Sequence, residues 1–69
     1  MAFIIATHKK DPRQEVYLSH VTNKSNGNYC FDTIRYARIF DSKEDAEMLL
    51  KLFSDRIDRL GDYDDIRIV

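Results

Sequence analysis

The chain has 69 residues, of which 11 are basic and 12 acidic, so its formal net charge is −1 at pH 7. This length fits a single domain over residues 1–69, and the near-zero net charge provides no strong field to attract nucleic acid or an anionic membrane. Cys30 is the only cysteine, which excludes a disulfide within the chain and is typical of a reducing compartment. A cytoplasmic location is therefore expected. The longest apolar run near the start, residues 2–6, is too short to span a membrane.

The first 21 residues predict a β-hairpin. Residues 2–7 are mostly apolar and residues 15–21 are rich in β-forming side chains, while Asp11-Pro12 between them is typical of a type I turn. A turn centred on Asp11-Pro12 would set three pairs of residues opposite one another: Phe3–His20, Ile5–Leu18 and Thr7–Val16. The side chains expected to face the core are then Phe3, Ile5, Val16 and Leu18. A slip of one residue would exchange the two faces.

Between the hairpin and the helix the sequence predicts a loop and several short elements. Residues 22–28 are all polar or glycine and form the expected loop. Residues 29–31 predict a brief third strand, residues 34–36 a single helical turn, and residues 37–40 extended chain.

The clearest element is an amphipathic helix from Ser42 to Leu60. Ser42 is expected to cap the first turn, with Asp45 three residues later. The apolar side chains recur at helical spacing along one face: Ala46, Leu49, Leu50, Phe53, Ile57 and Leu60. Gly61 suits the end of the helix. We expect Leu49, Leu50, Phe53 and Ile57 to supply most of the core.

Residues 62–69 predict a final strand, because Ile66 and Ile68 alternate with charged neighbours. The predicted fold class is α+β: a small, mainly antiparallel sheet of three to four strands, with one helix packed on one face, in the order β-β-(β)-β-α-β. The helix leaves the other face of the sheet uncovered.

No set of residues predicts catalysis, so we expect a protein that is not an enzyme and uses no cofactor, metal or small-molecule substrate. Cys30 lies between two aromatic residues and is expected to be a buried apolar side chain rather than a nucleophile. His8 and His20 fall at different ends of the hairpin, too far apart to share a metal. The aspartates at 55, 58, 62, 64 and 65 lack the glycine and closing glutamate of a calcium loop, and predict a solvated rim or an acidic contact patch.

The residues left for function are aromatic and basic. Tyrosine and arginine are enriched in protein interfaces. They predict a contact surface for a host or phage protein, or for a second copy of the chain, on the uncovered sheet face: Tyr17, Tyr36, Arg38 and Tyr63. The alternative is a small nucleic-acid-binding module that uses the basic side chains Lys9, Lys10, Arg13, Arg35 and Arg38.

The stretch 31–53 contains Ile34-x2-Ala37-x2-Phe40-x5-Ala46, with Asp41-Ser42 at the start of the helix. In this pattern the chain resembles very small phage and prophage accessory proteins of Gram-positive bacteria. The resemblance covers core and cap positions. It implies a compact strand-helix-strand ending and a product that acts by contacting a host or phage protein, as inhibitors of bacterial defence systems do. It assigns no functional residue.

Overall fold

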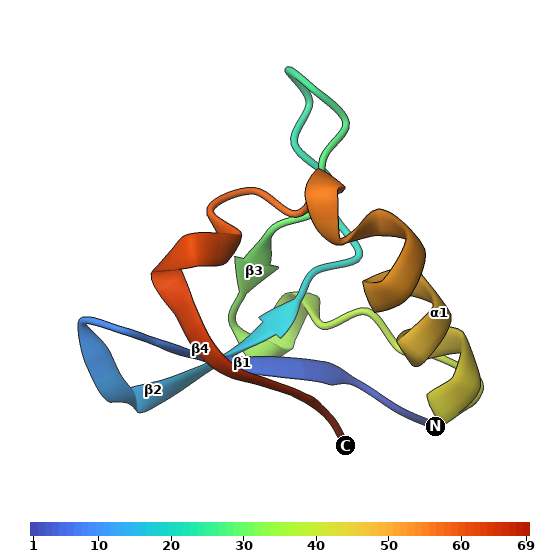
Figure 1. Cartoon of the computed structure of the whole chain (residues 1–69), viewed down its shortest axis with the longest axis horizontal. Coiled ribbons are helices and arrows are strands. Elements are labelled where there is room, and N and C mark those ends of the chain that lie inside the picture. The colour runs from blue at the N-terminus through green and yellow to red at the C-terminus, as the bar shows by residue number, and fades with distance from the viewer.

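The computed structural model describes residues 1–69 as a four-stranded antiparallel sheet with one α-helix (Figure 1). The strands are β1 (Ile4–His8), β2 (Asp11–Leu18), β3 (Phe31–Asp32) and β4 (Tyr63–Ile68), in the spatial order β3-β2-β1-β4. The helix α1 covers Lys43–Phe53, and three 3₁₀ turns are η1 (Ile34–Tyr36), η2 (Ser54–Arg56) and η3 (Leu60–Asp62). The predicted α+β class is confirmed. No helix in the structure is long and apolar enough to cross a membrane.

The predicted hairpin register is wrong by one residue. Ile5 pairs with Tyr17, and Ala6 pairs with Val16. Since side chains alternate between faces, the slip turns the side chain of Ile5 away from the helix and brings Ile4 and Ala6 into the core. Val16 and Leu18 face the core as expected. Phe3 lies with Ile5 on the other face, where its ring packs edge-on against that of Tyr17 with 5.9 Å between the ring centres.

The register differs because the chain turns at Lys9-Lys10 instead of Asp11-Pro12. His8 pairs directly with Asp11, whereas Thr7 pairs with Glu15, so residues 12–14 bulge out of the ladder. Pro12 has no N–H to donate, and a bulge is one of the few places in a sheet where that loss costs no ladder bond.

The third strand and the segment after it also differ from expectation. Strand β3 begins at Phe31, two residues later than predicted. Residues 37–40 form no regular strand, although Ala37 bridges to Ser19 and Phe40 bridges to Ala2. The Ala2–Phe40 bridge has two backbone hydrogen bonds of 2.9 Å. These two bridges hold the segment against the sheet, on the side where α1 packs (Figure 1).

The helix begins as predicted but ends seven residues early. The Ser42 hydroxyl accepts from the Asp45 amide at 3.2 Å. After Phe53 the chain leaves α-helical geometry and forms the 3₁₀ turn η2. The Tyr29 amide then donates to the Arg56 carbonyl and the Asp58 amide donates to the Tyr29 carbonyl, both at 2.8 Å. The residue after the helix that adopts left-handed backbone geometry is Arg59, with φ of 56°, and not Gly61 as predicted.

The core lies between the sheet and α1. The helix itself contributes Ala46 and Leu49, while Ile57 is buried from the segment that follows η2. Leu50 is only partly buried and packs against this cluster. Phe53 is 40% exposed, so its predicted place in the core is wrong. Phe53 is the last residue of the helix, and its side chain lines the groove described next.

Candidate functional site: a groove beside the helix

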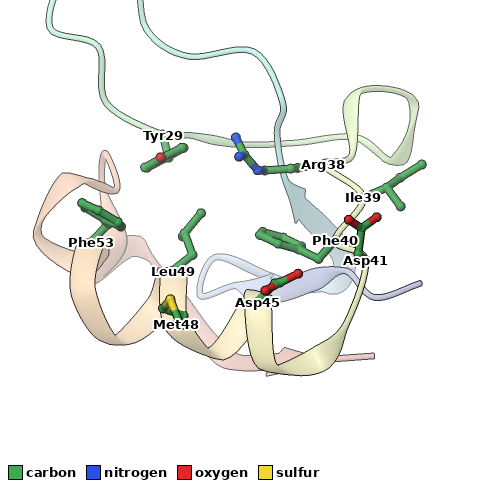
Figure 2. Close-up of a pocket in the computed structure, with 9 residues that line it drawn as sticks. All are labelled: Tyr29, Arg38, Ile39, Phe40, Asp41, Asp45, Met48, Leu49 and Phe53. Carbon is green, nitrogen blue, oxygen red and sulfur yellow. The ribbon is translucent and has the colours of Figure 1, made fainter.

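A groove of about 330 Å³ runs between α1 and the preceding segment 38–41 (Figure 2). Nine residues line it, six of them hydrophobic: Tyr29, Arg38, Ile39, Phe40, Asp41, Asp45, Met48, Leu49 and Phe53. The bridge from Phe40 to Ala2 fixes one wall, and the capped first turn of α1 fixes the other. The groove therefore stands on two elements that are tied to the sheet and the core.

Large apolar side chains surround this groove. Ile39 is 58% exposed on one wall, and Met48 and Phe53 are exposed on the helical wall. Leu52, one turn after Met48, is also 58% exposed. A contiguous apolar surface on a domain of this size is typical of a site that contacts another molecule.

Arg38 is the one basic side chain in the groove. Its guanidinium lies 5.7 Å from the ring centre of Tyr29 and 5.5 Å from that of Phe40. Figure 2 shows the side chain reaching along the groove toward Tyr29. No carboxylate of the chain lies within 4.0 Å of it. The two rings hold a partly buried cation whose five N–H donors are free to bind an acceptor from outside.

Two carboxylates line the groove beside Phe40 (Figure 2). Asp41 precedes the helix, and Asp45 lies in its first turn, where the positive end of the helix dipole stabilises an anion. Figure 2 shows both beside Phe40, away from Phe53. A bound segment therefore meets an apolar stretch at Leu49 and Phe53 and, toward Phe40, both a cation and two carboxylates (Figure 2).

The Tyr29 wall is positioned by Asp58, one of the aspartates predicted to form a solvated rim or an acidic contact patch. Asp58 accepts from three side-chain amides of the 22–28 loop: Asn28 at 2.9 Å, Asn23 at 3.0 Å and Asn26 at 3.4 Å. We call this set the asparagine clasp. It closes the loop onto the segment after α1, and Tyr29 follows directly, bonded through its backbone to Arg56 and Asp58.

The clasp predicts a pH dependence for stability. The amide of Asn28, followed by that of Asn23, holds the pKa of Asp58 below its ordinary value of 3.8. A group with a lowered pKa in the folded state stabilises the protein above its unfolded pKa, and this stabilisation is lost as the pH falls through the folded pKa. We expect Asp58→Asn to unfold at lower urea concentration than the wild type at pH 7, and the difference to shrink below about pH 4. Parallel urea titrations at several pH values measure this. A difference that stays constant down to pH 2 would contradict it.

The structure does not gather the four predicted contact residues on one face. Arg38 lies in the groove, and Tyr36 lies on η1 beside His20, with 6.4 Å between ring centres. Tyr63 is on the core side of the sheet, 4.6 Å from Phe31 between ring centres, and burial followed by the charge of Asp62 raises its pKa.

Tyr17 alone faces the side of the sheet away from the helix. This face is partly closed by the chain itself. Arg67 of β4 forms an ion pair with Glu15 of β2, passing over β1. Ile5, on the same face, is only 5% exposed. The face predicted to be open thus offers less apolar surface than the groove.

The basic residues of the alternative prediction do not meet. Lys9 and Lys10 lie at the hairpin turn, whereas Arg38 bonds through its backbone N–H to Leu18 at the far end of β2. At about 3.3 Å per residue, the eight residues of β2 place these two groups at opposite ends of a long strand. Arg13 belongs to the bulge beside the turn, and Arg35 belongs to η1.

Cys30 and the histidines form no reactive cluster. Burial, followed by the charges of Asp32 and Asp58, raises the pKa of the Cys30 thiol above its ordinary value, so the protonated form dominates at pH 7. The thiol donates to the Val21 carbonyl at 3.4 Å. No group of three or more His, Cys, Asp or Glu side chains is placed to hold a metal ion.

Two exposed apolar residues of the groove, Ile39 and Met48, are not among the residues that the sequence predicts for function. Met48 does have a signal in the sequence, because it lies four residues before Leu52 and forms with it a second apolar pair on the helix, away from the stripe that contains Ala46 and Leu49. Ile39 has no such signal, because its exposure depends on how residues 37–40 cross the sheet edge.

The chain matches no family model, and no curated protein or solved structure is similar to it.

Proposed function

We propose that this chain is a non-enzymatic protein-interaction domain that binds a segment of another protein in the groove beside α1. The observation that carries the proposal is the Arg38 guanidinium, held between two aromatic rings in an apolar groove and left without an acceptor from its own chain. Buried or half-buried arginines of this kind are common anchors in protein interfaces.

The chemistry of the groove describes the segment that fits it. An apolar side chain fills the floor between Ile39 and Phe53, and an adjacent carboxylate pairs with Arg38. A basic side chain of the segment, placed beside Phe40, faces Asp41 and Asp45 (Figure 2). These two aspartates disfavour a phosphate backbone, so the groove supports a protein partner over nucleic acid.

We place this activity in the cytoplasm, in keeping with the lone cysteine, and in a phage or prophage setting, in keeping with the resemblance of residues 31–53. In that setting the partner is a host or phage protein, including a component of a defence system that the chain inhibits. The chain would inhibit its partner by covering a surface of it, and this requires no chemical reaction.

The test compares two isoleucines of similar exposure. Ile39 is 58% exposed in the groove, and Ile34 is 65% exposed on η1 outside it. Ile39→Asp removes apolar contact worth about 1.5–3 kcal/mol and adds a charge, so we expect at least about a tenfold weaker capture of the partner. Ile34→Asp is the matched control and should bind as the wild type does.

Both variants and the wild type would be immobilised and exposed to an extract of the cells that make the protein, with the retained proteins quantified by mass spectrometry. Urea titration checks that each variant is folded. Arg38→Gln should weaken the same capture, with a loss that is smaller at high salt. Equal retention by Ile39→Asp and the wild type, or no retained protein at all, would refute the proposal.

A further inference from the structure

The outer face of α1, beyond the groove, carries a regular arrangement of charge around an apolar centre. Its shallow hollow of about 320 Å³ is lined by Glu44, Glu47, Met48, Lys51 and Leu52. These positions follow the spacing of three and four residues that places side chains in one stripe. Met48 and Leu52 are each 58% exposed.

The charges on this stripe are separated along the helix. Glu44 and Glu47 occupy its N-terminal half, and Lys51 occupies its C-terminal half. None of the three makes an ion pair with another residue of the chain. Met48 lies at the middle of the eleven-residue helix. Glu44 and Lys51 lie at equal distances from the midpoint between Glu47 and Met48, so they are complementary to each other when one copy is reversed.

We propose that a second copy of the chain docks on this face, with the two α1 helices antiparallel about a two-fold axis between Glu47 and Met48. Reversal sets Glu44 of one copy opposite Lys51 of the other, twice by symmetry, and stacks the two Met48 side chains between Leu52 and the partner's Leu52. A parallel arrangement would set like charges together. Antiparallel packing also places opposite ends of the two helix dipoles together.

The size of the surface sets the strength of the association. Eleven residues give a helix about 16 Å long. A contact of this length is smaller than the interface of about 1,600 Å² that stable complexes bury. The expected dimer dissociates in the micromolar to millimolar range, at about −4 to −8 kcal/mol of binding free energy. This dimer uses the outer face of α1, whereas the proposed function uses the groove, and only Met48 borders both.

The test uses charge reversal on the purified chain. Sedimentation equilibrium over a range of concentrations at low salt should show a monomer–dimer equilibrium for the wild type. Glu44→Lys sets two lysines against each other across the axis, and Lys51→Glu sets two acids against each other. Each variant alone should dimerise about tenfold more weakly, since two pairs of charges change from attraction to repulsion.

Mixing the two variants restores the pairing, because each then presents the charge that the other needs. An equimolar mixture of Glu44→Lys and Lys51→Glu should recover the wild-type affinity, and so should the double variant. Lys43→Glu, an exposed reversal outside the stripe, is the control and should leave the dimer unchanged.

A wild-type chain that stays monomeric up to about 1 mM overturns the proposal. A dimer that both single reversals leave intact overturns it equally, because its interface then lies elsewhere. Neither result bears on the groove, whose test depends on Ile39 and on a different protein as the partner.

Discussion

Replacing Leu49 by alanine is expected to lower the free energy of unfolding by about 2–5 kcal/mol. Leu49 is 7% exposed and packs in the single core cluster of ten buried residues. Alanine removes its apolar contacts and leaves a cavity that a small domain cannot refill. A 69-residue chain whose single cysteine allows no internal disulfide has about 3–5 kcal/mol of stability to lose. The variant should therefore be largely unfolded at 25 °C, as circular dichroism and urea titration would show.

The matched control is Leu52→Ala. It makes the same chemical change three residues further along the same helix, at a side chain that is 58% exposed. The change in helix propensity is the same, so the difference between the two variants measures burial alone. We expect Leu52→Ala to change stability by less than about 1 kcal/mol. Equal losses for the two variants would show that α1 packs on the sheet through a different face.

Ala46→Asp is expected to be the other severe substitution. Ala46 has no exposed surface and lies where α1 meets the sheet. The buried residues of the cluster around it are apolar, and an uncompensated buried charge costs about 3–5 kcal/mol. The loss equals the expected stability of the whole domain. Unfolded spectra at pH 7 are the expected result.

Met48→Asp is its control, because it introduces the same side chain two residues later at a position that is 58% exposed. This variant should stay folded in dilute solution. If Ala46→Asp also gave a folded protein with a cooperative urea transition, the helix would have to lie further from the sheet than the structure places it.

The sequence indicated the fold class because the strongest patterns were local. The cap at Ser42, the turn at residues 34–36 and the alternation at Ile66 and Ile68 each depend on neighbours in the chain. Each is present in the structure. The register of the β1–β2 hairpin is not local in this sense. It is set by a bulge of three residues after the Lys9-Lys10 turn, whereas the sequence contains a stronger turn signal at Asp11-Pro12.

The end of the helix also depended on distant residues. Ile57 and Leu60 continue the apolar spacing, and both pack on the core. They reach it through extended chain and a 3₁₀ turn, because the Tyr29 backbone and the asparagine clasp capture residues 56–58. Periodicity alone cannot distinguish a continuing helix from a chain that returns to the core by another path.

The groove could be predicted only in part. Arg38 was selected from composition, and the structure places it in the groove; its predicted companions Tyr17 and Tyr63 lie elsewhere. Backbone bonds to Arg56 and Asp58 hold Tyr29 near the end of α1, where Tyr29 and the exposed Phe53 both line the groove. These bonds join residues that are far apart in the sequence, so local patterns do not predict them.

The asparagine clasp contains a site, Asn26, that is prone to deamidation. Asn26 precedes Gly27, which has no side chain to hinder the attack of its amide nitrogen on the side-chain carbonyl of Asn26. This attack releases ammonia and forms a cyclic imide. Hydrolysis of the imide leaves aspartate or isoaspartate. In the folded chain the Gly27 amide is engaged by the Asn23 carbonyl at 2.7 Å, and the Asn26 side chain is engaged by Asp58. Deamidation of Asn26 would place a second carboxylate beside Asp58, and the two negative charges would repel each other. The folded loop therefore slows the reaction, and once the reaction has occurred the loop opens irreversibly.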